Sequence, residues 1–146
     1  MRGRSRSTSN GVDITLQVAA GLGAGRLRLW AVSARRRLPG RVGRLSIVLV
    51  GPALSRRLNR RYRGRNKPTN VLSWRWPPAA EQIGEPVWGE VLLCPAVIRR
   101  EASDFHRTYP EHLRRLLEHG LIHLLGADHQ TKADQRRWQR LERRLH

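Results

Sequence analysis

Residues 109–129, YPEHLRRLLEHGLIHLLGADH, contain the longest helical pattern in the chain. Leucines recur in it at spacings of three and four residues, which places them on one face of an α-helix. The members of this apolar face are Leu113, Leu116, Leu117, Leu121, Leu124 and Leu125. The pattern predicts a helix over about residues 109–125 that packs its leucines against the rest of the domain.

The segments around this helix predict a mixture of strands and further helices. Apolar runs and alternating patterns are typical of strands, and four are expected, over residues 12–18, 45–50, 69–74 and 87–94. Apolar residues at helical spacing, two of the segments beginning with proline, predict three further helices, over residues 26–37, 52–62 and 95–102. Thr131 and Asp134 form a capping-box-like pair that predicts the start of a last helix. The fold class expected is therefore α+β (mixed α/β), with one small mixed sheet of about four strands and about five helices.

The length and the cysteine content are those of one domain in a reducing compartment. A chain of 146 residues is the usual size of a single domain, and its single cysteine, Cys94, cannot form an internal disulfide. The sequence has no run of about 18 apolar residues, so it predicts no helix that crosses a membrane. Residues 1–11, MRGRSRSTSNG, are basic and lack an apolar segment, so we expect a disordered basic arm, with a transit peptide as the alternative. Residues 12–146 are expected to form the single domain.

The charge indicates the kind of partner. Lys and Arg number 29 against 11 Asp and Glu, which gives a net charge of +18. Such an excess favours a polyanion, nucleic acid before membrane, although a basic surface that is only solvated stays the alternative.

Three histidines near the end of the chain have the spacing of metal ligands. His119 and His123 are four residues apart and therefore project from the same side of a helix, as two imidazoles must do to bind one metal ion. A continued helix would turn His129 away from them, so it can join only if the helix ends first, at Gly126. Three imidazoles leave an open fourth position, which is typical of catalytic zinc. Histidines at accidental spacing are the alternative.

The neighbours of these histidines narrow the chemistry. A zinc peptidase with the motif H-E-x-x-H would have its glutamate directly after His119, where this chain has Gly120. Glu118 precedes His119 and is expected to point elsewhere, whereas Asp128 could fix the tautomer of a ligand imidazole. A metal site in so basic a chain favours a phosphodiester substrate. The remaining histidines lack this context and are expected at the surface: His106, His112 and His146.

A second segment, residues 58–74, LNRRYRGRNKPTNVLSW, combines cations, rings and hydrogen-bonding side chains. The planar guanidinium of arginine donates two parallel hydrogen bonds to phosphate. The segment predicts either a phosphate-binding loop or a basic surface turn. Tyr62 and Trp74 could stack on bases, although buried packing is the favoured interpretation of their rings.

These two segments together resemble the YbeY family of bacterial and organellar endoribonucleases. HGLIHLLGADH, residues 119–129, is similar to the family's histidine motif, and residues 58–74 are similar to its upstream motif. GEVLLCPAVIRREA, residues 89–102, is similar to a third stretch, with Glu90 in place of the usual aspartate. The resemblance runs from about Leu45 to at least His129.

The resemblance implies a function and a set of site residues. It implies a metal-dependent endoribonuclease, specific for single strands and containing one Zn²⁺, that acts in ribosomal RNA maturation, chiefly at the 3′ end of the small-subunit RNA, and in ribosome quality control. RNA and the ribosome are the partners expected, in the cytoplasm, with no DNA and no membrane. His119, His123 and His129 correspond to the metal ligands, and Arg63 corresponds to a catalytic cleft arginine.

Other residues complete the expected site. Asp128 is a candidate base or a partner of a ligand imidazole. Substrate contacts are expected from the polar and basic residues of the upstream motif: Arg61, Arg65, Lys67, Asn70 and Ser73. The alternative function is that of a non-catalytic, zinc-containing RNA- or ribosome-binding factor.

Overall fold

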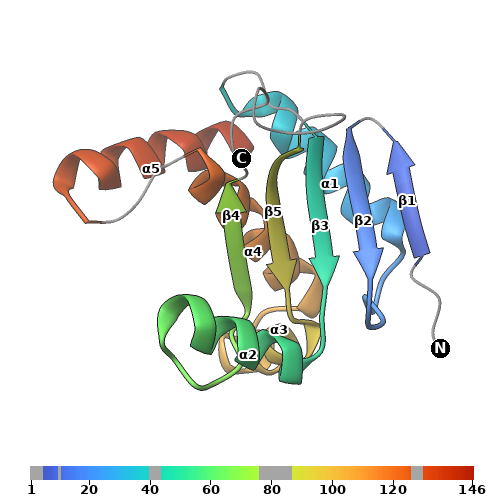
Figure 1. The fold of residues 1–146 in the computed structure, drawn as a ribbon. Coiled ribbons are helices and arrows are strands. Elements are labelled where there is room, and N and C mark those ends of the chain that lie inside the picture. Colours follow the sequence, from blue (N-terminus) through green and yellow to red (C-terminus); the bar gives the residue numbers. More distant parts are fainter. Residues whose placement is uncertain (1–4, 10, 40–43, 76–86, 126–129) are drawn as a thin grey trace.

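The computed structural model describes residues 5–9, 11–39, 44–75, 87–125 and 130–146. Its elements follow in the order β1 (Ser5–Ser9), β2 (Val12–Leu16), α1 (Ala24–Arg37), β3 (Arg44–Leu49), α2 (Pro52–Arg63), β4 (Val71–Arg75), β5 (Val87–Leu93), α3 (Pro95–Asp104), α4 (Tyr109–Leu124) and α5 (Lys132–Leu145) (Figure 1). Within the described ranges, no helix is long and apolar enough to cross a membrane.

One mixed sheet forms the centre of the domain. The strand order is β1-β2-β3-β5-β4, with β2, β3 and β5 parallel and the two edge strands antiparallel to their neighbours. The expected α+β class, with a small mixed sheet and five helices, is confirmed.

The sheet has one strand more than expected, at the N-terminal edge. A disordered arm was expected over residues 1–11, whereas Ser5–Ser9 pair with β2, Ser9 opposite Val12. Gly11 lies in the turn at a φ of +71°, a conformation that glycine adopts without steric cost. The first strand of this hairpin, β1, pairs with backbone groups that β2 would otherwise leave unpaired at an edge.

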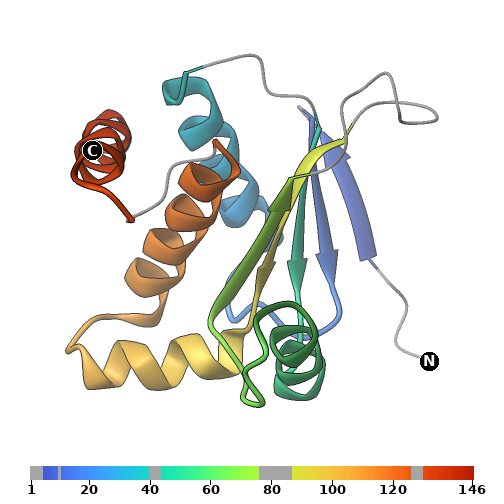
Figure 2. The same cartoon turned by 60° about the vertical axis from the view of Figure 1, so that its left-hand side comes forward.

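Alternation along the strands separates two cores. In β3, Leu45, Ile47 and Leu49 face α1 and α4, whereas Val48 belongs to a smaller cluster on the opposite face. Leu58 of α2 packs against that smaller cluster. Figure 2 accordingly shows α1 and α4 on one side of the sheet, α2 on the other, and α5 outside α4.

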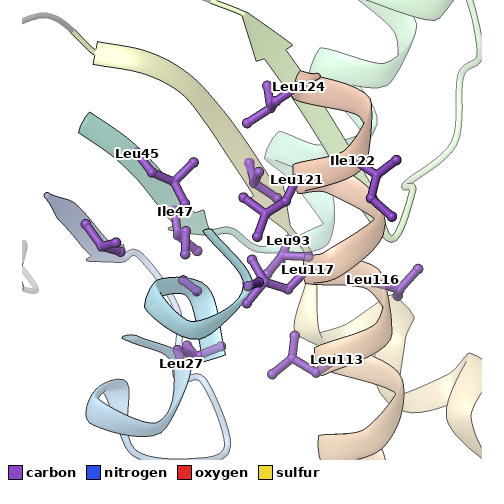
Figure 3. Close-up of a cluster of buried hydrophobic side chains, with 14 of the residues drawn as sticks. Leu27, Leu45, Ile47, Leu93, Leu113, Leu116, Leu117, Leu121, Ile122 and Leu124 are labelled. Carbon is purple, nitrogen blue, oxygen red and sulfur yellow. The ribbon is translucent and has the colours of Figure 1, made fainter. Parts of the chain in front are cut away.

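The main core lies between α4 and the sheet (Figure 3). The leucine face predicted from the sequence supplies it, and Leu113, Leu117 and Leu121 are completely buried. A β-carbon added at Gly120 would lie 2.8 Å from Val91 Cγ1, so the absence of a side chain there lets α4 approach β5 closely. Both the core and the position of the site therefore depend on this close approach.

Side-chain caps fix the starts of the two C-terminal helices. Thr108 and Glu111 form a capping box at the start of α4, and the capping box predicted from Thr131 and Asp134 is confirmed at α5. Helix α4 ends at Leu124, two residues before Gly126. Gly126 itself lies outside the described residues.

Candidate active site

His119 and His123 face the same element, as their spacing predicts. The imidazole centroids lie 5.0 Å and 4.7 Å from that of Trp138 on α5, and both rings meet the indole edge-to-face. One indole can contact both imidazoles only because they project from the same side of α4. His129 and Asp128, which were expected to join them, lie outside the described residues.

A carboxylate of α5 holds one of these imidazoles. His119 Nε2 lies 3.3 Å from Glu142 Oε1, and the two side chains are 30% and 38% exposed. Burial is the main cause that lowers the pKa of His119, and Glu142 opposes it. Burial therefore favours the neutral imidazole, which is the form that binds metals. Sequence reasoning missed Glu142 because nothing in its own segment indicates a partner 23 residues away.

Local geometry gives a physical reason against the peptidase alternative. Gly120 occupies the place of the peptidase glutamate and faces Val91 in the sheet, where no carboxylate could be accommodated. Glu118 is buried, and its carboxylate lies 3.0 Å from Arg114 Nε and 3.4 Å from His146 Nε2. Gly120 thus offers no carboxylate, and that of Glu118 is engaged by Arg114 and His146.

His112 corrects the prediction that the remaining histidines lie at the surface. It is buried, and its Nε2 lies 3.0 Å from Glu101 Oε2 on α3. The helix face that bears His112 is covered by α3, which its own sequence context does not reveal. His106 and His146 are exposed, as predicted.

The second motif forms the end of α2 and the loop that follows it. Ser55 and Asn59 are buried, and their side chains bind the loop backbone. Ser55 Oγ donates to the Thr69 carbonyl at 2.8 Å, and Asn59 Nδ2 donates to the Lys67 carbonyl at 2.8 Å. Gly64 ends α2 with a φ of +69°, which reverses the chain.

These inner hydrogen bonds leave the cations of the motif outside. Arg61, Arg63, Arg65 and Lys67 are all exposed. Among the described residues, the guanidinium of Arg63 forms no hydrogen bond or ion pair. The loop thus presents charges that the fold itself does not neutralise.

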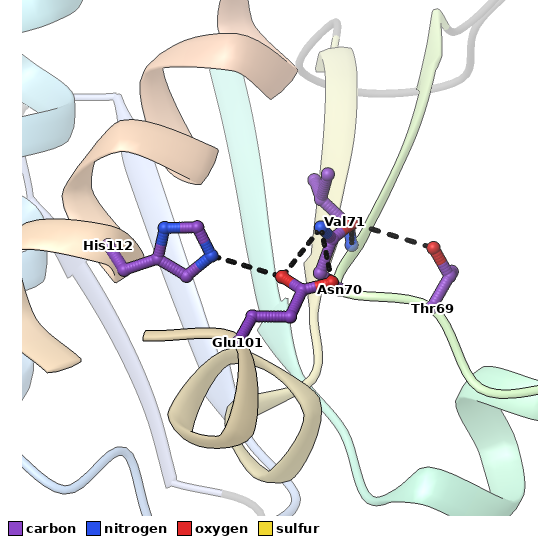
Figure 4. Close-up of polar contacts among 5 residues, drawn as sticks. All are labelled: Thr69, Asn70, Val71, Glu101 and His112. Carbon is purple, nitrogen blue, oxygen red and sulfur yellow. Dashed lines mark hydrogen bonds and ion pairs between the residues drawn. The ribbon is translucent and has the colours of Figure 1, made fainter. Parts of the chain in front are cut away.

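Asn70 is already engaged within the protein (Figure 4). Its Nδ2 donates to both carboxylate oxygens of Glu101, at 3.2 Å and 3.0 Å, and its Oδ1 accepts from the Val71 amide at 2.6 Å. Glu101 in turn contacts His112. This chain of polar contacts ties the loop to α3 and α4, and sequence reasoning missed Glu101 and His112 as its members.

The predicted substrate residue Ser73 and the ring of Trp74 lie on opposite faces of the sheet. Ser73 lies on the same face of β4 as Val71, toward α4, whereas Trp74 packs on the opposite face, toward α2. The basic loop leads into the edge strand β4, and α4 packs against that same strand, so β4 connects the loop to the helix that carries the histidines.

Two of the three histidines expected to bind a metal ion lie within the described residues. His119 and His123 converge on one indole, as two ligands from one helix must converge. Within the described part of the chain, no three His, Cys, Asp or Glu side chains form a metal-binding group. The two histidines therefore fit part of a metal site whose other expected ligand is not described.

Fold and site together define a small α+β domain that carries a histidine pair on its central helix and a basic loop at the adjacent sheet edge. A family model described as "Endoribonuclease YbeY" matches residues 28–146. The chain therefore belongs to the YbeY family, as the sequence motifs indicated.

Individual relatives agree with this assignment. An endoribonuclease YbeY from Halorhodospira halophila is 41% identical over 108 residues, covering 73% of this chain and 70% of the relative. Another, from Alkalilimnicola ehrlichii, is 38% identical over 122 residues, covering 81% and 72%. A solution structure from Thermotoga maritima matches with a TM-score of 0.55 and 24% identity, covering 92% of this chain and 88% of that one, and it supports the fold alone.

Proposed function

We propose that the chain is a metal-dependent endoribonuclease that cuts single-stranded RNA during ribosomal RNA maturation, at the 3′ end of the small-subunit RNA, and in ribosome quality control. The observation that carries the proposal is the convergence of His119 and His123 on Trp138, inside the segment that matches the endoribonuclease family. The ribosome is its expected partner, the cytoplasm its expected compartment, and DNA is not expected as a substrate.

The metal site is proposed to consist of His119, His123 and His129, with Zn²⁺ as the ion. When bound, such an ion supplies Lewis acidity toward a phosphate oxygen and lowers the pKa of water. Glu142 would accept a hydrogen bond from the His119 ring and hold the neutral tautomer, as carboxylates beside metal-bound histidines do. Asp128 is proposed to act as a base or to orient a second imidazole.

The basic loop is proposed to bind the scissile strand. Arg63 is exposed at the end of α2 and would stabilise the charge that develops on the phosphate oxygens. Arg61, Arg65 and Lys67 would guide the strand through its phosphates, with a strong dependence on salt. Ser73 can offer a hydroxyl beside α4, whereas Asn70 holds the loop through Glu101.

The test combines metal analysis with a cleavage assay. The purified chain is expected to contain one metal ion and to cut a short single-stranded ribosomal RNA precursor, and a chelator should abolish cleavage. His123→Ala and Arg63→Ala should both lose cleavage, and only His123→Ala should also lose the metal. Arg36→Ala removes an exposed arginine of α1 and is the matched control for charge.

Two outcomes would contradict the proposal. Metal and RNA binding without cleavage would favour the non-catalytic ribosome factor. Cleavage by pure Arg63→Ala protein at the wild-type rate would indicate a contaminating nuclease.

A further inference from the structure

A pocket on the α2 side of the sheet lies apart from the histidine pair. It has a volume of about 290 Å³ and is lined by Leu58, Tyr62, Trp74, Arg75 and Glu90. Leu58 and Glu90 also line a neighbouring groove of similar volume between α2 and the strands, so the pocket continues along the sheet. None of these residues takes part in the metal site proposed above.

The walls of the pocket are two aromatic rings with unequal exposure. Trp74 packs against the small core on this face, whereas Tyr62 is 55% exposed. Their centroids lie 5.3 Å apart, with planes inclined at 66°. The Trp74 ring is held by packing, and the Tyr62 ring extends beyond it with apolar surface that the fold does not cover. Flat, partly exposed rings of this kind are the surfaces on which unpaired bases stack.

Charge on the rim favours a nucleic acid over an apolar ligand. Arg75 lines the pocket, and the guanidinium of Arg61 lies 5.6 Å from the Tyr62 ring centre. Arg63 follows Tyr62 directly at the end of α2, and the chain as a whole carries a net charge of +18. A base stacked on the exposed Tyr62 ring would therefore have its phosphate among arginines.

Glu90 gives the pocket a selective group. Its Oε2 accepts a hydrogen bond from Ser46 Oγ at 3.2 Å, and no hydrogen bond to its Oε1 is present among the described residues. A carboxylate accepts hydrogen bonds only, so it suits bases with amino donors. Guanine offers two adjacent donors to one carboxylate, whereas uracil offers one donor between two carbonyl oxygens.

We propose that this pocket binds one unpaired base of the RNA, guanine in preference to uracil, adjacent to the phosphate that Arg63 contacts. The base stacks on the exposed ring of Tyr62, which Trp74 supports edge-on, and Glu90 accepts hydrogen bonds from the edge of the base. The inference rests on the proposed function, because it assigns a base-binding subsite to the same substrate.

Binding of labelled RNA with the metal removed by chelator tests the pocket without cleavage. The probes are an octamer of uridines and the same octamer with one central guanosine, followed by fluorescence anisotropy. The wild-type chain should bind the guanosine octamer about tenfold more tightly than the uridine octamer. Tyr62→Ala should weaken binding of the guanosine octamer about tenfold, as loss of one stacked base does.

Three further variants separate the pocket from general effects. Tyr62→Phe keeps the ring and should restore affinity, and Glu90→Gln should reduce the preference for guanosine. Phe105→Ala is the matched control, since Phe105 is 60% exposed and also has an arginine over its ring, but lies at the end of α3. Circular dichroism checks that each variant is folded.

The outcomes distinguish this inference from the proposed function. Equal affinity of folded Tyr62→Ala and Phe105→Ala for the guanosine octamer, or equal wild-type affinity for both octamers, would overturn the pocket. If the wild-type chain nevertheless cleaves RNA with metal present, the proposed function stands and only the subsite is wrong. If the wild-type chain fails to cleave, the proposed function is wrong whatever the octamers show.

Discussion

Helix α4 carries two histidine–glutamate pairs that look alike and differ in their surroundings. His112 lies 3.0 Å from Glu101, and His119 lies 3.3 Å from Glu142. The His112 side chain is only 5% exposed, against 30% for His119. Seven residues, or about two helical turns, separate the two histidines.

The partners of each glutamate give the pairs different roles. Glu101 also receives both hydrogen bonds of the Asn70 amide, so the first pair joins α3, α4 and the basic loop. His119 instead lies against Trp138 with part of its ring exposed, and His123 shares that indole. Burial thus makes the first pair a structural contact, and partial exposure leaves the second able to meet a ligand.

The largest expected effect comes from replacing the histidine of each pair with alanine and comparing the two variants. His119→Ala should reduce metal-dependent RNA cleavage by more than about 100-fold, because removal of a ligand should exceed the effect of removing its hydrogen-bond partner. The folded fraction of His112→Ala protein should bind metal as wild type does. Metal content and initial cleavage rates of both variants check this, and a metal-free, inactive His112→Ala protein with native circular dichroism would break the comparison.

Replacing the two glutamates should show the same contrast: metal affinity should depend on Glu142 and not on Glu101. Glu142→Gln replaces the carboxylate beside His119 and should weaken metal binding about 10- to 100-fold, the effect found for such partners of metal-bound histidines. Titration of the metal-free protein with Zn²⁺, followed by tryptophan fluorescence, measures the affinity. Glu101→Gln is the matched control and should bind Zn²⁺ like wild type. Equal affinities of the two variants would mean that Glu142 does not act on the site.

The sequence allowed much of the fold to be predicted, but not the roles of these four residues. Leucine spacing predicted α4, and Thr131 with Asp134 predicted the start of α5, because both signals are local in the chain. Glu142 meets His119 only because α5 docks on α4, a tertiary event without a local signal. His112 lacks the sequence context of the pair His119 and His123 and was therefore predicted at the surface, whereas α3 covers it in the structure.

A smaller effect, on stability, is expected at the first pair. His112→Ala removes a buried hydrogen-bond partner of Glu101 and leaves a cavity, which should lower the free energy of unfolding by about 2 kcal/mol. For a domain of this size that corresponds to a fall in Tm of roughly 6 °C. Thermal unfolding followed by circular dichroism measures the change. A Tm within about 1 °C of wild type would show that the network contributes little stability, and His119→Ala should change the Tm of the metal-free protein less.

Glu90 can be compared with the glutamates of the two pairs, and here the smallest effect is expected. Its half-buried carboxylate accepts a hydrogen bond from the hydroxyl of Ser46 rather than from an imidazole. Burial raises the pKa of Glu90 above its usual 4.5, and the hydrogen bond from Ser46 opposes this. Between pH 4.5 and the raised pKa of Glu90, the folded chain therefore holds a proton that the unfolded chain has released. Stability should fall as the pH rises from 4.5 through the raised pKa, and then stay level.

Glu90→Gln removes this titration. The variant should have a higher Tm than wild type at neutral pH, with the difference shrinking toward zero near pH 4, where the wild-type carboxyl is protonated as well. Thermal melts of both proteins from pH 4 to 8 give the difference directly. A Tm difference that is constant over this range would mean that Glu90 has the same pKa folded and unfolded. A variant with a lower Tm than wild type at neutral pH, by a difference that shrinks toward acid pH, would mean that the fold stabilises the Glu90 carboxylate, as it would if an arginine on the rim of the pocket paired with it.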